Sequence, residues 1–285
     1  MPNDEKYQVI EREYVLNEKI DSTPEVLVIR LKSEDGKPWP FDPGMFMMIS
    51  GVDKEGKKHI ARAFSIASDP SAPEIEFFIV KEPRHPKVVG QPAAASAAQA
   101  APARNPQATA PAAESATEPA NRFPEPQYTH FMNANIGDAF VLKGPSGQFR
   151  FDPAKDNKVL FIAGGTGLAP FMSMLRHLKV IGSKIDVKMM YSIKYPTEVI
   201  LREEMERLVK DLNIGMTITV TRPQPGDGWT GVTGHIAENM MRECVVDVPQ
   251  RMCYICGPLA FVKAVKDALM HCGVDEKRIS ADVWG

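Results

Sequence analysis

The sequence has little excess charge, few cysteines and no long apolar run. Its 285 residues carry a formal net charge of -2, which leaves the chain without the basic surface that nucleic-acid binding requires. No apolar run approaches the ~20 residues needed to cross a bilayer, and the first residues, MPNDEKYQVIEREY, lack the basic-then-apolar order of a secretory signal. These absences predict a cytoplasmic protein with no transmembrane segment. The length is about twice that of a typical domain and predicts two domains.

The cysteines are too few for a disulfide framework. They lie in the last fifth of the chain, at Cys244, Cys253, Cys256 and Cys272. Cys253 and Cys256 form a C-x-x-C pattern within residues 252–258 (MCYICGP), an apolar run typical of a buried strand. Residues three apart on a strand point to opposite faces. We therefore interpret these two as ordinary buried thiols and expect no metal site, with zinc or an iron–sulfur cluster as the alternative.

Residues 83–127 differ in composition from the rest of the chain. Prolines recur there, and half of residues 93–120 are alanine, so this stretch cannot bury enough apolar surface to offset the entropy of ordering it. We expect a disordered insertion. Runs of β character lie on both sides of it, at 74–80 (EIEFFIV) and 136–149 (IGDAFVLKGPSGQF). With the short runs between residues 7 and 67, they predict an antiparallel barrel or sandwich over residues 1–155 that the insertion interrupts.

After residue 156 strand-like and helix-like runs alternate, beginning with 158–164 (KVLFIAG) and 169–182 (APFMSMLRHLKVIG). This alternation predicts an α/β domain over residues 156–285, with a parallel sheet whose ligand sites lie at the carboxyl ends of the strands. The first strand runs into a glycine-rich turn, 164–170 (GGTGLAP). Free backbone N–H groups and a helix N-terminus meet there, which suits a phosphate. A tight strand-to-helix connection is the alternative for this turn taken alone.

Four motifs occur in one order along the chain, namely 62–65 (RAFS), 144–149 (GPSGQF), 164–170 (GGTGLAP) and 256–258 (CGP). Together they resemble the ferredoxin–NAD(P)H reductase family of flavoenzymes, over essentially the whole chain outside the insertion. The resemblance implies a two-domain fold, an antiparallel β-barrel flavin-binding domain followed by an α/β parallel-sheet NAD(P)-binding domain. It also implies FAD as cofactor. Because the insertion falls where relatives hold the adenosine half of the flavin, FMN stays open.

The resemblance assigns the RAFS motif, with Ala63, to the flavin. Arg62 would pair with the flavin phosphate, Phe64 would pack on the isoalloxazine or ribityl chain, and Ser65 would hydrogen-bond near the flavin N5. Alternate strand positions share a face, so Arg62 and Phe64 can act together. Thr129 matches a residue that starts a short helix at the flavin pyrophosphate.

Near the end of the chain, Asp282 and Trp284 are candidates for proton handling and for covering the flavin ring. Cys256 resembles the cysteine beside the nicotinamide, and the next two residues, Gly257 and Pro258, turn the chain away from it. The catalytic candidates are therefore Ser65, Cys256 and Asp282.

On the nucleotide side, the resemblance implies that the glycine-rich turn approaches the NAD(P)H pyrophosphate. The residues assigned to it are Gly164, Gly165, Thr166, Gly167 and Pro170. The second strand of the sheet ends with Ser192 and Lys194 and no carboxylate, and Arg222 ends the third. A basic residue in such a place accommodates a 2′-phosphate, which favours NADPH, with NADH as the alternative.

These assignments predict an oxidoreductase that passes electrons between NAD(P)H and a separate one-electron carrier, a ferredoxin-like protein or a partner redox subunit, by hydride transfer to the flavin N5. The alternative is a non-catalytic flavin- or nucleotide-binding regulatory subunit. A hydrolase is a weaker alternative, because residues 144–148 (GPSGQ) do not complete G-x-S-x-G, and Cys256 as a general nucleophile lacks a histidine motif. Three lysines of one loop, Lys54, Lys57 and Lys58, would steer an acidic partner if they are more than solvated charge.

Overall fold

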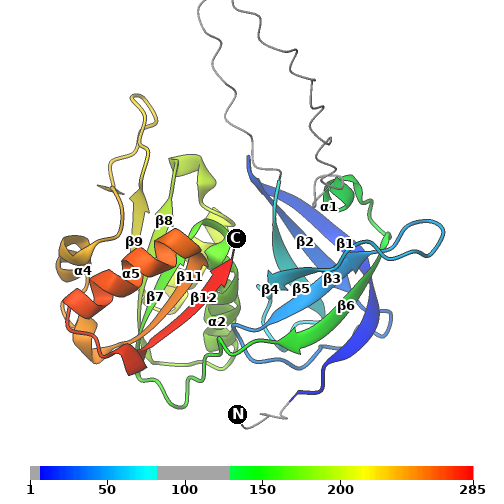
Figure 1. Cartoon of the computed structure of the whole chain (residues 1–285), viewed down its shortest axis with the longest axis horizontal. Helices are drawn as coiled ribbons and strands as arrows, with labels where there is room; N and C mark the ends of the chain where they lie inside the picture. The colour runs from blue at the N-terminus through cyan, green and yellow to red at the C-terminus, as the bar shows by residue number, and fades with distance from the viewer. Residues whose placement is uncertain (1–6, 82–128, 285) are drawn as a thin grey trace, which may run out of the picture.

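The computed structural model describes residues 7–81 and 129–284, with the side chain of Thr129 excepted. The predicted insertion at residues 83–127 lies outside the described residues. Two six-stranded sheets follow one another along the chain and lie side by side (Figure 1). The predicted division between residues 155 and 156 falls in the connection between them and stays a prediction. No helix in the described ranges is long and apolar enough to cross a membrane.

The first sheet is a nearly closed antiparallel barrel. Its strands are β1 (Ile10–Thr23), β2 (Val26–Lys32), β3 (Phe46–Gly51), β4 (Arg62–Ser65), β5 (Glu74–Val80) and β6 (Ala139–Ser146), in the order β4-β3-β6-β1-β2-β5. The edge strands β4 and β5 approach each other just beyond β4, where Ala67 N–H donates to the carbonyl of Glu76 at 2.9 Å. The helix α1 (Thr129–Asn133) leads into β6, and Phe131 fills the barrel core with Phe77 and Phe140.

The second sheet is entirely parallel. Its strands are β7 (Lys158–Gly164), β8 (Asp186–Ile193), β9 (Gly215–Val220), β10 (Val232–Thr233), β11 (Met252–Pro258) and β12 (Ile279–Trp284), in the order β10-β9-β8-β7-β11-β12. The connections contain the helices α2 (Ala169–Val180), α3 (Arg202–Asp211), α4 (Glu238–Cys244) and α5 (Leu259–His271), and the 3-10 turns η1 (Gly165–Leu168), η2 (Pro196–Glu198), η3 (Val248–Gln250) and η4 (Glu276–Arg278). The helices α2 and α3 cover one face and α4 and α5 the other. The predicted fold class is confirmed, although the two edge strands, β10 and β12, had no strand prediction.

The barrel and the sheet share an apolar interface. Strand β2 begins with four buried residues and β5 contains five, because one face of each strand lines the barrel and the other packs on the neighbouring domain. Val26, Val28 and Phe78 of this outer face belong to the same apolar cluster as Phe171 and Tyr254 of the α/β part. The runs 26–31 and 74–80 therefore lack the polar alternation of a strand with one wet face.

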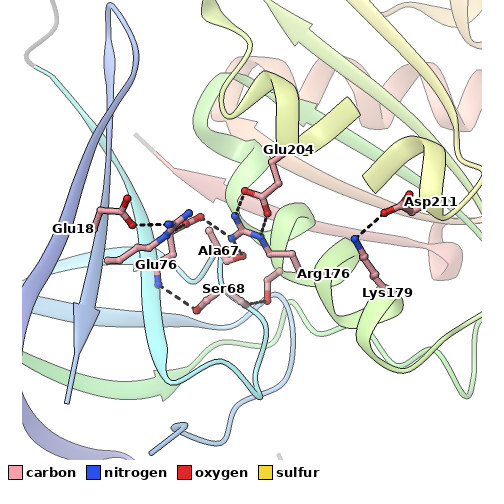
Figure 2. Close-up of polar contacts among 10 residues, drawn as sticks. Glu18, Ala67, Ser68, Glu76, Arg176, Lys179, Glu204 and Asp211 are labelled. Carbon is pink, nitrogen blue, oxygen red and sulfur yellow. Dashed lines mark hydrogen bonds and ion pairs between the residues drawn. The ribbon is translucent and has the colours of Figure 1, made fainter. Parts of the chain in front are cut away.

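A buried ion-pair network crosses the same interface (Figure 2). Arg176 of α2 donates to Glu76 of β5 at 2.6 Å, to the carbonyl of Ala67 at 2.7 Å, and to Glu204 of α3 at 2.7 and 2.9 Å. The second carboxylate oxygen of Glu76 accepts from Arg30 at 2.7 Å. Burial alone would lower the pKa of Arg176, but Glu76 and Glu204 raise it overall. The charge is thus held permanently, and it fixes α2 against the barrel.

Replacing Glu76 by glutamine tests this network. The largely buried guanidinium of Arg176 and the half-buried guanidinium of Arg30 would lose their shared carboxylate. Glu76→Gln should therefore lower the free energy of unfolding by about 3 kcal/mol, measured by urea denaturation. Asp211→Asn is the matched control. It removes an ion pair with Lys179, which lies on α2 like Arg176, but both side chains of this pair are about half exposed. The control should cost less than about 1 kcal/mol. Equal losses would contradict the network's role.

Candidate functional site

A cleft of about 690 Å³ lies between the parallel sheet and the barrel. The chain moves outward from β7 through β8, β9 and β10, then returns to the other side of β7 to form β11 and β12. Such a reversal opens a crevice at the carboxyl ends of the strands, and the cleft lies there. The barrel contributes the turn between β1 and β2, with Thr23 and Glu25, and the ends of β2 and β5, with Val26 and Val80.

The cleft brings together most of the residues predicted for the nucleotide. Its lining includes Gly164, Gly165, Thr166, Ser192, Lys194, Arg222 and Pro258, together with Trp284, which was predicted to cover the flavin ring. Five strand ends supply these residues, so they are neighbours only because the strands are parallel and in register. Among the described residues, Gly167, Pro170 and Gly257 do not line the cleft, and neither do the catalytic candidates Cys256 and Asp282.

Glycine is required in the turn after β7 for two different reasons. Gly165 has a φ of 56°, in the left-handed region. A Cβ on Gly167 would overlap the carbonyl group of Cys256 and lie 2.9 Å from the Gly257 nitrogen. Gly167 therefore allows η1 to pack on the end of β11, while Gly164 and Gly165 leave bare backbone at the cleft.

Phe261, in the first turn of α5, is a lining residue that the sequence reasoning missed. Its Cδ1 atom would lie 2.9 Å from a Cβ on Gly164 and 2.7 Å from a Cβ on Gly257. The aromatic ring thus rests on the glycines that end β7 and β11. The sequence signal for this residue was its position, an aromatic residue three positions after the CGP motif at 256–258.

Cys256 and Asp282 face each other on paired strands, with 4.0 Å between the Cys256 Sγ and an Asp282 carboxylate oxygen. Burial, and then Asp282, raises the pKa of the fully buried Cys256 thiol well above its ordinary value, and burial raises the pKa of Asp282. A neutral thiol is the opposite of an activated nucleophile. Both residues lie two positions inside the Pro258–Trp284 pair that lines the cleft.

The C-x-x-C pattern does not form a joint ligand pair. Cys256 packs in the apolar cluster under α2, whereas Cys253 packs in the cluster under α4 and α5. The two thiols lie on opposite faces of the sheet, as residues three apart on a strand must. They cannot bind one metal ion together.

The β4 residues form a separate group at the side of the barrel that faces the sheet (Figure 1). Phe64 is half-buried, with its ring edge-on to Phe131 at 5.3 Å and to Phe77 at 6.4 Å. Ala63 is exposed, and Ser65 is half-buried opposite Phe46 of β3. None of the β4 residues lines the cleft. Thr129 begins α1, but its side chain is outside the described part of the structure.

Two buried nitrogen atoms beside β4 lack hydrogen-bond partners among the described residues, Arg62 Nε and His130 Nε2. Buried polar atoms are nearly always paired. A cationic guanidinium and an imidazole with open donor capacity suit an anionic oxygen. The residues present therefore fit the phosphate of a flavin nucleotide, the role that the resemblance assigns to Arg62.

Near the ends of β8 and β9, the cleft is lined by both basic and acidic side chains. Lys194 Nζ lies 3.9 Å from Glu25 of the barrel. Glu198, another lining residue, accepts from the backbone N–H groups of Lys194 and Tyr195 at 2.9 and 3.4 Å. The expectation that no carboxylate ends the second strand missed Glu198, which reaches back from η2. The Arg222 side chain makes no hydrogen bond or ion pair with the described residues.

Comparison with known proteins agrees with this geometry. Residues 161–267 match the family model described as the oxidoreductase NAD-binding domain. The chain is 29% identical over 168 residues to the "Glycine betaine monooxygenase reductase subunit" of Chromohalobacter salexigens, covering 58% of this chain and 46% of that protein. It is 32% identical over 162 residues to one component of the Na(+)-translocating NADH-quinone reductase of Yersinia pestis, covering 55% and 40%. The match thus spans less than half the length of these curated relatives.

Solved structures resemble the chain over both sheets. The "Ferredoxin reductase in carbazole 1,9a-dioxygenase" has a TM-score of 0.72 at 20% identity, covering 98% of this chain and 71% of that one. A ferredoxin NADP+ reductase from Neisseria gonorrhoeae with bound FAD and NADP has a TM-score of 0.67 at 17% identity, covering 98% and 99%. At these identities the likeness establishes the fold.

Gly167→Ala tests the packing of the glycine-rich turn. The added methyl group has no space against the backbone of β11, so we expect the free energy of unfolding to fall by about 3 kcal/mol, measured by urea denaturation. Gly182→Ala is the control. Gly182 has a φ of 63° with no atom within 4 Å of an added Cβ, so it should show only the left-handed backbone cost of about 1 to 2 kcal/mol. A smaller loss for Gly167→Ala than for the control would refute the close approach.

Proposed function

We propose that this chain is a ferredoxin reductase-type protein, because it combines an antiparallel barrel with a parallel sheet that matches the oxidoreductase NAD-binding domain. The protein passes electrons between NAD(P)H and a one-electron carrier through hydride transfer to a flavin. The observation that carries this proposal is the cleft at the carboxyl ends of the parallel strands. There the glycine-rich turn of the α/β part opens toward the barrel that bears the RAFS motif.

FAD is the proposed cofactor and NAD(P)H the substrate, with FMN as the alternative flavin. When bound, a flavin takes a hydride from NAD(P)H and delivers electrons singly, so it joins a two-electron donor to a one-electron acceptor. The protein's part is positioning. Arg62 and Phe64 hold the flavin, Ser65 hydrogen-bonds near its N5, and the backbone of Gly164 and Gly165 receives the nucleotide pyrophosphate.

The remaining residues control water and protons around the reacting rings. Trp284 covers the ring side of the cleft. The apolar side chains of Val26, Val80 and Ile193 line it and limit water entry. Cys256 supports the nicotinamide side of the cleft from beneath, because its small neutral thiol is buried two positions inside Pro258. Asp282, whose pKa is raised by burial, holds a proton to higher pH than an exposed carboxyl group does.

The proposed electron partner is a separate protein. Two of the similar proteins are called reductase subunits of a glycine betaine monooxygenase and of a stachydrine N-demethylase, names that describe a reductase working with a second component. A ferredoxin-like carrier or a partner redox subunit fits that arrangement. Lys58 is paired with Glu11, which leaves Lys54 and Lys57 of the predicted steering loop for an acidic partner.

The cytoplasmic location remains a prediction, and free thiols at all four cysteines suit a reducing compartment.

Anaerobic mixing with NAD(P)H separates the enzyme from the alternative of a passive binding subunit. The visible absorbance of the FAD-loaded protein should bleach rapidly in a stopped-flow measurement, because a hydride reaches the flavin. A non-catalytic subunit would keep its flavin oxidised.

Arg62→Ala and Phe64→Ala should purify with less than about one-tenth of the wild-type flavin, since each removes a binding contact worth about 1.5 to 3 kcal/mol. Arg207→Ala, an exposed arginine of α3, should retain full flavin content.

Coenzyme choice is tested at Arg222. Its guanidinium lines the cleft and is available for a 2′-phosphate, so we propose NADPH as the preferred coenzyme. Arg222→Gln should lower kcat/KM for NADPH about 10- to 100-fold, as expected for the loss of a charge-assisted hydrogen bond. The value for NADH should change less than about twofold. An equal loss with both coenzymes would assign Arg222 to overall binding, and a wild-type preference for NADH would point to Glu198 and Glu25 as ribose ligands.

A further inference from the structure

Two histidines stack beside the flavin-side motif. His59, in the loop before β4, and His130, in α1, have ring centroids 4.8 Å apart and planes only 7° apart. Gly51 of β3 makes room for the stack, because a Cβ there would lie 2.5 Å from His130 and 3.3 Å from His59. The stack therefore depends on three separate parts of the barrel, namely β3, the loop before β4, and α1.

Among the described residues, the charges that act on His130 are of one sign. Burial, then His59, then Arg62 lower the pKa of His130 from 6.5 to about 4. The rings of Phe131 and Phe140 pack on the other sides of His130 and supply no charge.

A carboxylate close to this loop is already engaged. Lys58, next to His59, forms an ion pair with Glu11 of β1, so that carboxylate is not shared with the histidines. Two of the three buried side-chain atoms that lack hydrogen-bond partners in the described ranges, Arg62 Nε and His130 Nε2, belong to this same group. Within residues 7–81 and 129–284, no acceptor is recorded for these two donor atoms.

We propose that His59 and His130 join Arg62 in one anion site that binds the phosphate groups of the flavin nucleotide and takes up a proton as it does so. This inference rests on the proposed function and adds two residues and a pH dependence to it. Without an anion, burial, His59 and Arg62 keep the half-buried His130 neutral. A phosphate dianion between them reverses that balance, so binding should raise the pKa of His130. His59 is exposed, which gives the site its opening to solvent.

The sign of the pH effect follows from this coupling. The pKa of His130 is low in the free protein and higher in the complex, so binding is tightest at acid pH and weakens as the pH rises through the pKa of the complex. Riboflavin has the same ring system without phosphate, and its binding should not follow the histidines. The phosphate groups and the rings can therefore be measured separately.

Calorimetric titration of the flavin-free full chain with FAD, FMN and riboflavin tests the site. His130→Gln and His59→Gln should each weaken FAD and FMN binding about 10-fold and leave riboflavin within about twofold. In the wild type, the Kd for FAD should rise about 10-fold between about pH 6 and about pH 8, the range in which imidazoles titrate, and titrations in two buffers of different ionisation enthalpy should show proton uptake. His271→Gln, at the exposed end of α5, is the control and should behave as the wild type.

Histidine NMR of the wild type tests the site independently of variant folding. FAD or inorganic pyrophosphate should raise the pKa of His130. The inference is overturned if neither ligand moves the His130 resonance, or if the variants bind FAD and FMN as tightly as the wild type. Equal weakening of riboflavin and FAD would also overturn it, because that result assigns the stack to barrel structure. Failure of the proposed function looks different, since the wild type would then bind no flavin while pyrophosphate still shifts His130.

Discussion

The position of α2 against the barrel is the constraint on which both halves of the site depend. Arg176 lies two turns along the helix that begins at the glycine-rich turn, and its guanidinium reaches Glu76 and the carbonyl of Ala67. Ala67 follows the flavin-side motif by two residues. One buried side chain therefore connects the segment proposed to hold the flavin with the helix whose start is proposed to hold the nucleotide. Ser173 of the same helix adds a hydrogen bond to the Ser68 carbonyl at 2.7 Å.

Buried charge needs a dry and rigid surrounding, and the apolar interface supplies it. The outer faces of β2 and β5 are covered by residues of the α/β part such as Phe171 and Tyr254, with Phe149 packed edge-on to Tyr254 at 5.7 Å. An ion pair in such a place contributes less to net stability than to a single geometry, because desolvation offsets much of its attraction. Hydrophobic burial holds the domains together, and the paired charges select one orientation among those that burial allows.

The sequence predicted the fold and the nucleotide side of the site well because both follow from local patterns. Alternating apolar strands and amphipathic helices mark a parallel sheet, and a parallel sheet places strand ends such as Ser192, Arg222 and Pro258 at one edge. Strand β12 was missed because most of its residues are exposed or half-exposed, so it lacks an apolar run. Glu198, Phe261 and the His59–His130 stack depend on how a side chain reaches across from another element, and residue spacing carries no such information. Gly167 was assigned to the ligand, whereas a neighbouring strand explains it.

The two proposed phosphate sites are built from different materials, and the difference matches what each must do. At the glycine-rich turn the proposed donors are backbone N–H groups, which bear no net charge and cannot titrate. Arg222 is proposed to bind the 2′-phosphate, which only NADPH carries. A substrate that must leave after each turnover suits such a site, since its affinity varies little with pH. At β4 the proposed donors are the side chains of Arg62, His59 and His130, and the Arg62 Nε and His130 Nε2 atoms are buried. We expect that construction to bind a phosphate more tightly and to couple it to a proton, as suits a cofactor that stays in place while substrates exchange.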